Sequence, residues 1–487
     1  MKKILAAVAA LVVVLAAVLV VRTTVFGPER QAAAAPAPAV AAPDAPGHLA
    51  QAIAIRTVSH QDPAEDDGAA FTAFTDWLAA TYPAVHGAMT REILGGHTPL
   101  YTWTGSDPAL RPVLLTAHYD VVPVDPDSVA AGRWTHPPYA GTLADGFVWG
   151  RGSLDDKSAV VALMEAAEVL VKEGFKPRRT LMLSFGHDEE VGGTRGAGAV
   201  AAALKERGVT AEWSLDEGSF LLSGLIPGID RPVANINLAE KGYLTVQLVA
   251  TGAAGHSSMP PRETATGVLA RAILRLQDDP FPGGLDGITG AMFDSLAGDL
   301  PFVQRLLFAN RWLFDPVLDM VLSGANTTNA LLRTTVAPTM LRGSPKENVL
   351  PATAVATVNL RLHPRDTVDG AVARLRDTIA DDRVAVKVAT ANPASPVSSA
   401  DTAAFRLLGR AARQVYGDVL VAPGLTIAGT DSQHYATVAA NSYRFNPMVV
   451  TRKDIAGIHG DDERISVDNL VRATAFYTVL MRQGLAD

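Results

Sequence analysis

The stretch TLMLSFGHDEEVGG (residues 180–193) decides the fold and points to the site. Its first half is a short apolar run typical of a buried strand, and its second half places three consecutive acids where that strand leaves the core. Because neighbouring side chains of an extended segment point to opposite sides, Glu189 and Glu190 can serve two different purposes. The two glycines that follow let the backbone turn away. Two carboxylates at the end of a central strand indicate a functional site, and the other motifs of the sequence indicate its chemistry.

Segments that read alternately as strands and helices surround this stretch. RPVLLTAHYDVV (residues 111–122) is an apolar strand that ends in polar residues, and residues 158–174 form a helix with Gly174 as its expected stop. A helix over 196–208 and a strand that ends in SLDEG (residues 214–218) follow. This rhythm predicts an α/β domain, a mostly parallel sheet covered by helices. In such a sheet, functional groups gather beyond the carboxyl ends of the strands.

The pattern changes near Ala239. Residues 241–252 alternate as a half-buried strand does, and helices are expected over 264–277 and 367–380. This mixture predicts a smaller α+β domain inserted into the first, and an unusually aromatic and aliphatic stretch interrupts it. The expected divisions are 47–239 with 398–487 for the first domain, 240–397 for the second domain, and about 281–324 for the apolar insert.

The N-terminal residues predict export. Two lysines precede an unbroken apolar run over residues 4–21, which Arg22 closes. This run is long for the core of a signal peptide and just long enough to span a bilayer. We therefore expect residues 1–26 to be a membrane anchor or a signal peptide, and residues 27–46 to be an Ala/Pro-rich linker. The folded part would be extracytoplasmic (periplasmic or lumenal) and membrane-anchored, or secreted if the N-terminal segment is cleaved.

Composition narrows the class of protein. The chain has 487 residues, of which 48% are hydrophobic and 19% charged, as in globular proteins. A net charge of −8 gives no support to a nucleic-acid partner, which would require a basic surface. Cysteine is absent, so the chain has no disulfide, no thiolate nucleophile and no sulfur ligand for zinc. Any metal must be bound by His, Asp and Glu.

Histidines and carboxylates of this kind follow several predicted strands. Oxygen and imidazole ligands without sulfur suit a catalytic zinc pair, although manganese or cobalt would also fit. A two-metal hydrolase needs a bridging carboxylate, because its ions lie only about 3.5–4 Å apart, and a further carboxylate that takes the proton of the attacking water. The candidates are His118 and Asp120 in AHYD, Asp155 and Asp156 in GRGSLDDK, Glu189 and Glu190 in HDEE, Asp216 and Glu217 in SLDEG, and His459 in GIHGDDE.

Each motif taken alone has a simpler explanation. His118 and Asp120 could be a hydrogen-bonded pair, and Asp155 could cap the helix that follows it. The DEE run could be a solvated charge run or the acidic first turn of a helix. The ordered set at successive strand ends favours a metal site over coincidence.

The motifs HYDVVPV…W…PPYAG, GRGSLDDK, DEEVGG, LDEG and GHSSMPP closely resemble, in the same order, those of the di-zinc metallopeptidase family of glutamate carboxypeptidase and aminoacylase. The nearest branch resembles carboxypeptidase S and the secreted N-fatty-acyl-amino-acid hydrolases. The resemblance covers roughly residues 50–487. It implies two Zn²⁺ ions, for which Co²⁺ or Mn²⁺ could substitute. It also implies that the second domain is a lid and dimerisation domain, and hence a homodimer.

The resemblance further implies a role for each residue at the predicted strand ends. Glu189 would be the general base that activates water and then protonates the leaving nitrogen, and Asp120 would orient the imidazole of His118. The peptide bond between Asp155 and Asp156 would be cis. The implied metal ligands are His118 and Asp216 for one zinc ion, Glu190 and His459 for the other, and Asp155 bridging both.

Four more site residues come from the resemblance. His256 in AGHSSMP would stabilise the tetrahedral oxyanion, in many family members from the partner subunit. Asn348 in ENVLP and Arg361 in NLRLHP would bind substrate, and an arginine can hold a carboxylate with two parallel hydrogen bonds. Gly429 in AGTDSQHY would let the backbone approach the substrate, although a tight turn explains this glycine almost as well.

These roles predict a hydrolase that cleaves an amide whose leaving group is an amino acid with a free carboxylate. A carboxypeptidase or dipeptidase and an N-fatty-acyl-amino-acid amidohydrolase, which could also run in the synthetic direction, both fit. A metal-binding surface receptor without catalysis is an alternative of another class, but such a receptor needs no general base. The apolar insert is expected to pack the lid or a dimer contact. The sharper hypothesis is that it forms an apolar wall for an acyl chain, with Phe308 and Trp312 contributing.

Overall fold

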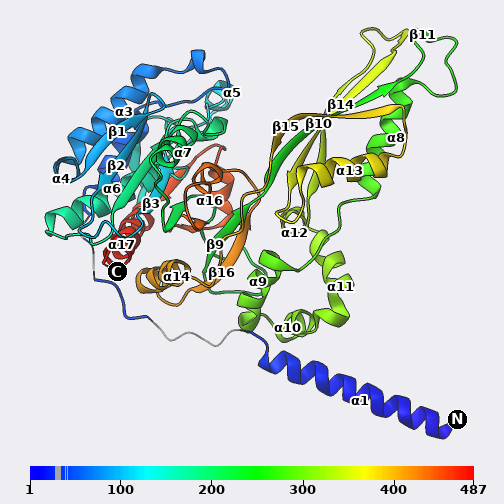
Figure 1. The fold of residues 1–487 in the computed structure, drawn as a ribbon, viewed down its shortest axis with the longest axis horizontal. Helices are drawn as coiled ribbons and strands as arrows, with labels where there is room; N and C mark the ends of the chain where they lie inside the picture. Colours follow the sequence, from blue (N-terminus) through cyan, green and yellow to red (C-terminus); the bar gives the residue numbers. More distant parts are fainter. Residues whose placement is uncertain (28–33, 39, 41, 487) are drawn as a thin grey trace.

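Two separate sheets organise the chain, of which the computed structural model describes residues 1–27, 34–38, 40 and 42–486 (Figure 1). The larger sheet has ten strands in the order β1-β2-β6-β3-β7-β17-β9-β8-β18, with β16 paired to β9. Pairs β3–β6, β3–β7, β7–β17 and β9–β16 are parallel, so the predicted fold class is confirmed. The strands are β1 (Thr90–Leu94), β2 (Thr98–Trp103), β3 (Val113–His118), β6 (Leu181–Gly186), β7 (Trp213–Asp216), β8 (Leu221–Leu222), β9 (Val233–Glu240), β16 (Leu420–Thr426), β17 (Ser442–Arg444) and β18 (Val449–Val450).

Helices bury both faces of this sheet, which is why its central strands read as unbroken apolar runs. The main core gathers around α6 (Lys157–Lys172), which packs against α17 (Val467–Gly484). A smaller core under α7 (Ala197–Glu206) includes Leu100 and Leu114. The other elements of this part are α2 (Ala45–Ala54), α3 (Gly68–Thr81), α4 (Pro83–Ala88), α5 (Pro126–Ala130), α14 (Ala403–Tyr416), α15 (Ser432–Tyr435), α16 (Arg452–Gly457), and a three-stranded sheet of β4 (Thr142–Ala144), β5 (Phe147–Trp149) and β19 (Arg464–Ser466).

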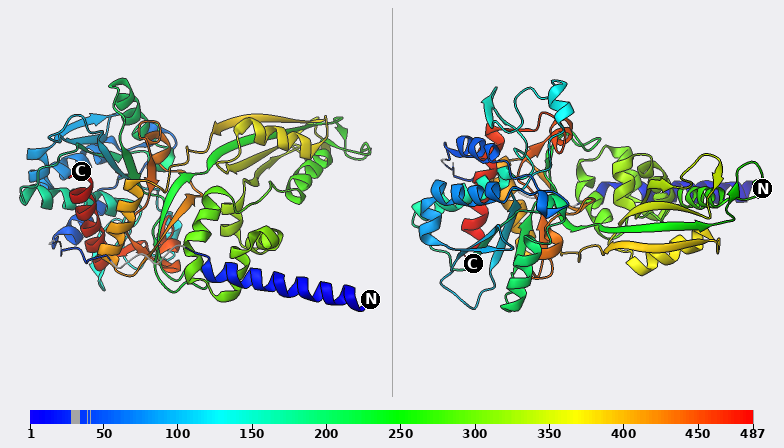
Figure 2. Two further views of the ribbon diagram at one scale, coloured as in Figure 1. Left: turned by 60° about the horizontal axis from the view of Figure 1, so that its bottom comes forward. Right: turned by 90° about the horizontal axis from the view of Figure 1, so that it is seen from above.

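The second sheet extends away from the first (Figures 1 and 2). Its four strands are antiparallel, in the order β12-β14-β10-β15. Alternate residues of β10 and β14 are buried in a separate core under two helices, as the sequence alternation predicts. The elements are β10 (Gly242–Thr251), β12 (Thr335–Arg342), β14 (Thr353–Leu362), β15 (Val384–Asn392), α8 (Ala265–Asp278), α13 (Val368–Ile379), and a short pair of β11 (Gly255–His256) with β13 (Val349–Leu350) at the far end.

The apolar insert folds mainly as helices that pack against the first sheet, whereas its first residue, Phe281, is buried in the core of the second sheet. Phe293, Leu296 and Phe308 share a small core with Val233 of β9 and Ala422 of β16. The sequence places this insert within the second domain, and its packing side is therefore the main difference from that expectation. The helices are α9 (Gly287–Leu296), α10 (Phe302–Ala309), α11 (Arg311–Ser323) and α12 (Asn326–Leu332).

The N-terminal helix α1 (Lys2–Val25) projects from the body of the molecule, with its C-terminal end beside α10 (Figure 2). It is long and apolar enough to cross a membrane, a test that a signal sequence also passes. The predicted linker over 27–46 falls partly outside the described residues. Its last part is ordered, since Ala42 and Ala45 are buried and α2 begins at Ala45.

Candidate metal centre

The site lies where three adjacent parallel strands of the large sheet end. β3 ends at His118, β6 at Gly186 just before the acidic run, and β7 at Asp216. His118 and Gly186 are register partners, so the histidine and the acidic run leave the sheet side by side. Parallel strands put their carboxyl ends on one edge, which explains why residues so far apart in sequence meet here.

Asp155 stands between two histidines, with one carboxylate oxygen for each. Its Oδ1 lies 3.0 Å from Nε2 of His118, and its Oδ2 lies 3.1 Å from Nε2 of His459. On the second side, His459 Nε2 also lies 3.0 Å from Oε2 of Glu190. One carboxylate that faces two imidazoles with different oxygens is the arrangement that a bridging ligand requires. The peptide bond between Asp155 and Asp156 is cis, as predicted.

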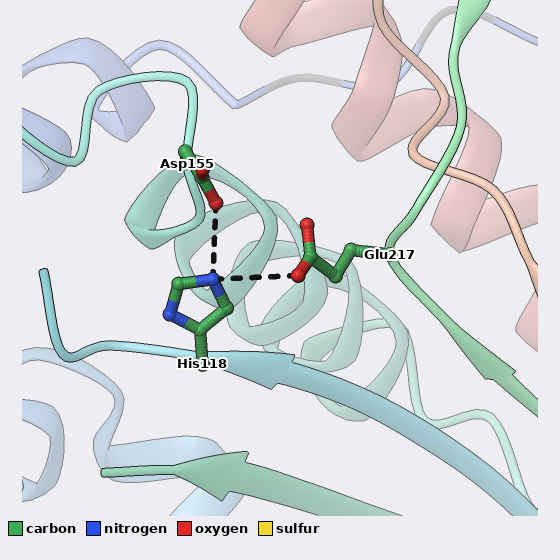
Figure 3. A group of neighbouring side chains, drawn as sticks. All are labelled: His118, Asp155 and Glu217. Carbon is green, nitrogen blue, oxygen red and sulfur yellow. Dashed lines mark hydrogen bonds and ion pairs between the residues drawn. The ribbon is translucent and has the colours of Figure 1, made fainter. Parts of the chain in front are cut away.

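The residue that comes to His118 from the end of β7 is Glu217 (Figure 3). Glu217 Oε1 lies 3.6 Å from His118 Nε2, and the side chains of His118, Asp155 and Glu217 converge. Asp216, which the sequence proposes as the ligand, instead accepts a hydrogen bond of 2.7 Å from the hydroxyl of Thr116 inside the sheet. The LDEG motif thus supplies a carboxylate to this side, but from the residue after the strand and not from the last residue in it.

Asp120 organises the acidic run as well as the histidine. Its Oδ1 lies 3.4 Å from Nδ1 of His118, and its backbone carbonyl lies closer to the same nitrogen, at 3.1 Å. The two carboxylate oxygens of Asp120 accept hydrogen bonds from the backbone N–H groups of Glu189 and Glu190, each at 3.1 Å. The buried Ser59 hydroxyl donates to it as well. Asp120 therefore sets the position of both glutamates, which turn off the strand in a short 3₁₀ segment over Glu189–Val191.

A buried glutamate holds the loop that carries Asp155. Glu463 accepts backbone hydrogen bonds from Gly152, Leu154 and Asp155 and pairs with Arg151 at 2.6 Å. Sequence reasoning missed this residue, although it stands in the same GIHGDDE motif as His459. The GIHGDDE segment thus supplies the candidate ligand His459, and its Glu463 holds the loop of the candidate ligand Asp155 in place.

Charges at the site are unbalanced without cations. Burial raises the pKa of Glu189, Glu190 and Glu217, with repulsion between the neighbouring carboxylates contributing. Hydrogen bonds that His459 donates to the carboxylates of Asp155 and Glu190 raise its pKa to about 10. Burial opposes ionisation of Asp155, but its hydrogen bonds with the two histidines outweigh burial and lower its pKa. Crowded carboxylates next to imidazoles supply the negative charge and the donor atoms that a divalent cation needs.

The donor set fits two divalent cations. His118, Asp155 and Glu217 offer ligand atoms within 4.8 Å of one another, and so do Asp155, Glu190 and His459. Two groups that share one aspartate, each with one imidazole nitrogen and two carboxylates, match the ligand preference of zinc, and of manganese or cobalt. Three protein ligands for each ion also leave a position open, as catalytic sites require.

Three predicted site residues lie in the second domain, at opposite ends of its sheet. Arg361 of β14 pairs with Tyr243 of β10 near the junction with the first domain, and its guanidinium lies 4.7 Å from the tyrosine ring centroid. His256 and Asn348 lie together beyond the far end, where the Asn348 carbonyl accepts from the N–H of Ser257. Since β10 has ten residues, that end is about 30 Å further along the sheet. Within one chain, β11, which carries His256, therefore lies far from β3 and the metal centre (Figure 1).

Gly429 lies in an exposed loop after β16, and a Cβ there would meet nothing within 4 Å. Two residues later, Asp431 is buried against the glycines that flank the acidic run. Burial and the nearby carboxylate of Asp216 raise its pKa. Asp431 was missed in the sequence because its motif contains no strand-end signal.

Comparison with known proteins agrees with this architecture. Residues 114–483 match the model of peptidase family M20/M25/M40, and the chain belongs to that family. This confirms the resemblance found in the sequence and the prediction of a hydrolytic enzyme of the metallopeptidase class.

Two kinds of relative are almost equally similar to the chain. A protein of Dictyostelium discoideum named probable carboxypeptidase S-like 2 is 38% identical over 439 residues, which cover 89% of this chain and 84% of that protein. The mouse protein named N-fatty-acyl-amino acid synthase/hydrolase PM20D1 is 37% identical over 436 residues, 88% of this chain and 85% of the relative. Among solved structures, the M20 family metallo-carboxypeptidase Sso-CP2 of Sulfolobus solfataricus shares the fold, with a TM-score of 0.63 at 18% identity over 90% of this chain and 98% of that one.

Proposed function

We propose that the protein hydrolyses an amide bond whose leaving group is an amino acid with a free carboxylate, using two divalent metal ions. The observation that carries this proposal is the pair of ligand groups that share Asp155, with Glu189 next to them and without a cation partner of its own among the described ion pairs. A site that only binds metal would have no need of that additional carboxylate.

The proposed ligands are His118, Asp155 and Glu217 for one ion, and Asp155, Glu190 and His459 for the other. Glu217 replaces Asp216 in this assignment because its Oε1 lies 3.6 Å from Nε2 of His118, whereas Oδ1 of Asp216 accepts a hydrogen bond from the Thr116 hydroxyl. Bound divalent ions supply an acidified water and polarise the substrate carbonyl.

The side chains of the protein handle the proton. Glu189 accepts a proton from the attacking water and returns it to the nitrogen of the departing amino acid. Glu189 directly precedes the proposed ligand Glu190 in the short segment that leaves β6, which places a carboxylate beside the two ligand groups to hold that proton between the two steps. Asp120 keeps Glu189 in place through the backbone hydrogen bond described above.

Residues of the second domain would recognise the substrate. Arg361 stands at the end of the second sheet nearest the metal centre, where its guanidinium can bind the free carboxylate of the substrate. His256 and Asn348 would serve the site of a second copy of the chain, His256 by stabilising the oxyanion. The second domain is thus proposed as a lid and as the dimer contact, and Gly429 is proposed to border the substrate.

Residues 1–26 are proposed as a retained membrane anchor, with the catalytic domain outside the cytoplasm. The lysines at its start and the single Arg22 at its end fit the orientation in which basic residues stay inside.

Replacement of Glu189 by Gln tests the proposal. The amide keeps the size of the side chain but cannot accept the proton, so turnover should fall about 10²–10⁴-fold while the metal content of the purified protein stays the same. Metal analysis and a hydrolysis assay on one sample measure both. Metal binding without turnover in the parent protein would favour the metal-binding receptor instead, and turnover that Glu189→Gln leaves unchanged would exclude Glu189 as the base.

A second candidate function is an N-fatty-acyl-amino-acid hydrolase, which the 37% identity to the mouse relative supports. Turnover of Gly-Leu and N-oleoyl-leucine by the zinc-loaded protein distinguishes the two. Preference for the dipeptide supports a carboxypeptidase or dipeptidase, and preference for the oleoyl compound supports the amidohydrolase. Both outcomes keep the same metal chemistry, whereas hydrolysis of neither would contradict the proposed substrate class.

A further inference from the structure

The insert presents an apolar surface to solvent right beside the N-terminal helix. On α11, Trp312, Leu313, Val317, Met320 and Val321 are exposed. Spacings of four residues place 312, 316 and 320, and likewise 313, 317 and 321, along one side of the helix. Phe302 and Val303 at the start of α10 are exposed as well. We call these seven side chains the insert face.

Polar contacts inside the protein fix the insert face relative to α1. The side-chain amide of Asn310, between α10 and α11, donates to the carbonyl of Leu19 at 3.3 Å and lies 3.4 Å from the hydroxyl of Thr23. Arg22 Nε donates to the carbonyl of Ala309. Asn310 and Thr23 have no exposed surface, although both residues are polar. The end of α1 is therefore docked on the insert through these hydrogen bonds, and is not a free tether.

The position of this contact along α1 determines how far the insert lies from the centre of a bilayer that α1 would cross. The apolar run over residues 4–21 is about 27 Å long as a helix, close to the roughly 30 Å of a bilayer's hydrocarbon core. Leu19 and Thr23 lie at the C-terminal end of that run. If α1 crosses the bilayer, α10 and α11 are held at the boundary between hydrocarbon and water.

We propose that the insert face lies in the outer interfacial layer of the bilayer that α1 crosses, as a second membrane contact of the protein. Exposed apolar surface of this kind is uncommon on soluble monomers and marks an interaction site. Helices that lie in the plane of a membrane bury their apolar side about 5–10 Å into the boundary region, and tryptophan is enriched there. Lipid is favoured over another protein as the occupant because α10, which carries Phe302 and Val303, packs against the end of α1, whose apolar span is unburied within the molecule.

This contact does not depend on the metal chemistry, so its test uses no activity measurement. The chain has no cysteine, and single cysteines can therefore be introduced into the full-length protein and labelled with an environment-sensitive fluorophore. The test position is Met320→Cys, which is 68% exposed and thus safe for folding. Asp315→Cys on the same helix and Asp369→Cys on α13 are matched controls, and Val8→Cys in α1 reports the span itself.

Each labelled protein is reconstituted into phosphatidylcholine vesicles with or without brominated acyl chains. We expect blue-shifted emission and quenching by brominated lipid at Met320→Cys and Val8→Cys, and neither at the two aspartate positions. A Met320 label as water-exposed as the Asp369 control would overturn the proposal. It would also be overturned if the Val8 label were not quenched by lipid, or if the Met320 label were shielded from water without lipid quenching and transferred energy between copies, which would mean that a second copy covers the insert face.

Discussion

At the scale of single residues, the proposed metal ligands depend on which carboxylate at the end of β7 lies beside His118. Glu217→Gln and Asp216→Asn remove the same charge at neighbouring positions. We expect Glu217→Gln to lower both the metal content and turnover, because it removes a proposed ligand. Asp216→Asn should keep its metal, since an amide oxygen can still accept from the Thr116 hydroxyl. Metal analysis after dialysis decides between them, and the reverse pattern would restore Asp216 as the ligand.

A second residue-scale feature is the glycine pair after the acidic run. Gly193 has φ of +64°, and a Cβ there would collide with the carboxylate of Asp431. Gly192 also has positive φ, at +104°, but its Cβ would meet nothing within 4 Å. Gly192→Ala should cost only backbone strain, about 1–3 kcal/mol, whereas Gly193→Ala should cost more. Denaturant unfolding measures the difference, and equal losses would show that the Asp431 contact yields easily.

At this scale, the sequence predicts correctly those site residues that the strand topology brings together. His118 and the DEE run could be placed together because adjacent parallel strands share one edge. The resemblance selects Asp216 as the ligand, whereas Glu217 lies closer to the histidine in the structure, since both stand at the end of one strand and only the local turn decides which side chain approaches His118. Asp431 and Glu463 act by burial beneath the site, which no strand-end pattern reveals.

At the scale of elements, α10 and α11 carry one aromatic residue that is buried and one that is exposed. Phe308 is only 7% exposed and stacks on Phe293 at 4.6 Å between ring centroids, whereas Trp312 is 58% exposed. Phe308→Ala should therefore cost about 3–5 kcal/mol of stability and reduce turnover of short and long substrates alike. Phe308 is thus part of the insert core, and the hypothesis that it lines an acyl wall does not fit its position.

Trp312→Ala is the matched comparison, and its free energy of unfolding should stay within about 0.5 kcal/mol of the parent. Thermal unfolding of both variants in the same detergent checks the pair. Loss of stability by Trp312→Ala as large as that of Phe308→Ala would mean that the exposed face of α11 is covered within the protein itself.

Elements also differ in how well their sequence predicts which side is buried and which neighbour buries it. The strict alternation of β10 and β14 predicts one buried face, and their burial patterns show it. The insert is rich in apolar residues, of which some are buried and others exposed, so its sequence does not tell which neighbour it packs on. Here the packing partner turned out to be β16, more than a hundred residues later in the chain.

At the scale of the whole molecule, the second sheet acts as a spacer. Its near end carries Arg361, and its far end carries His256 and Asn348 about 30 Å away. A single chain therefore has the ligands and the general base in one place and the proposed oxyanion group in another. The strand pattern predicts both ends, but the distance between them becomes apparent only in the assembled fold.

This separation predicts that inactive variants can repair each other. A dimer of one Glu189→Gln chain and one His256→Ala chain has one site with an intact Glu189 that receives an intact His256 from its partner. The other site carries both defects. Because random pairing of equal amounts makes about half of the dimers mixed, co-expression should recover about a quarter of the parental turnover. Pairing Glu189→Gln with His459→Ala is the matched control, since both groups belong to the same chain's metal centre and no intact site can form. Tandem purification of differently tagged mixed dimers should raise the recovered turnover to about half of the parental value. No recovery in the first pair would mean that His256 does not act across the dimer.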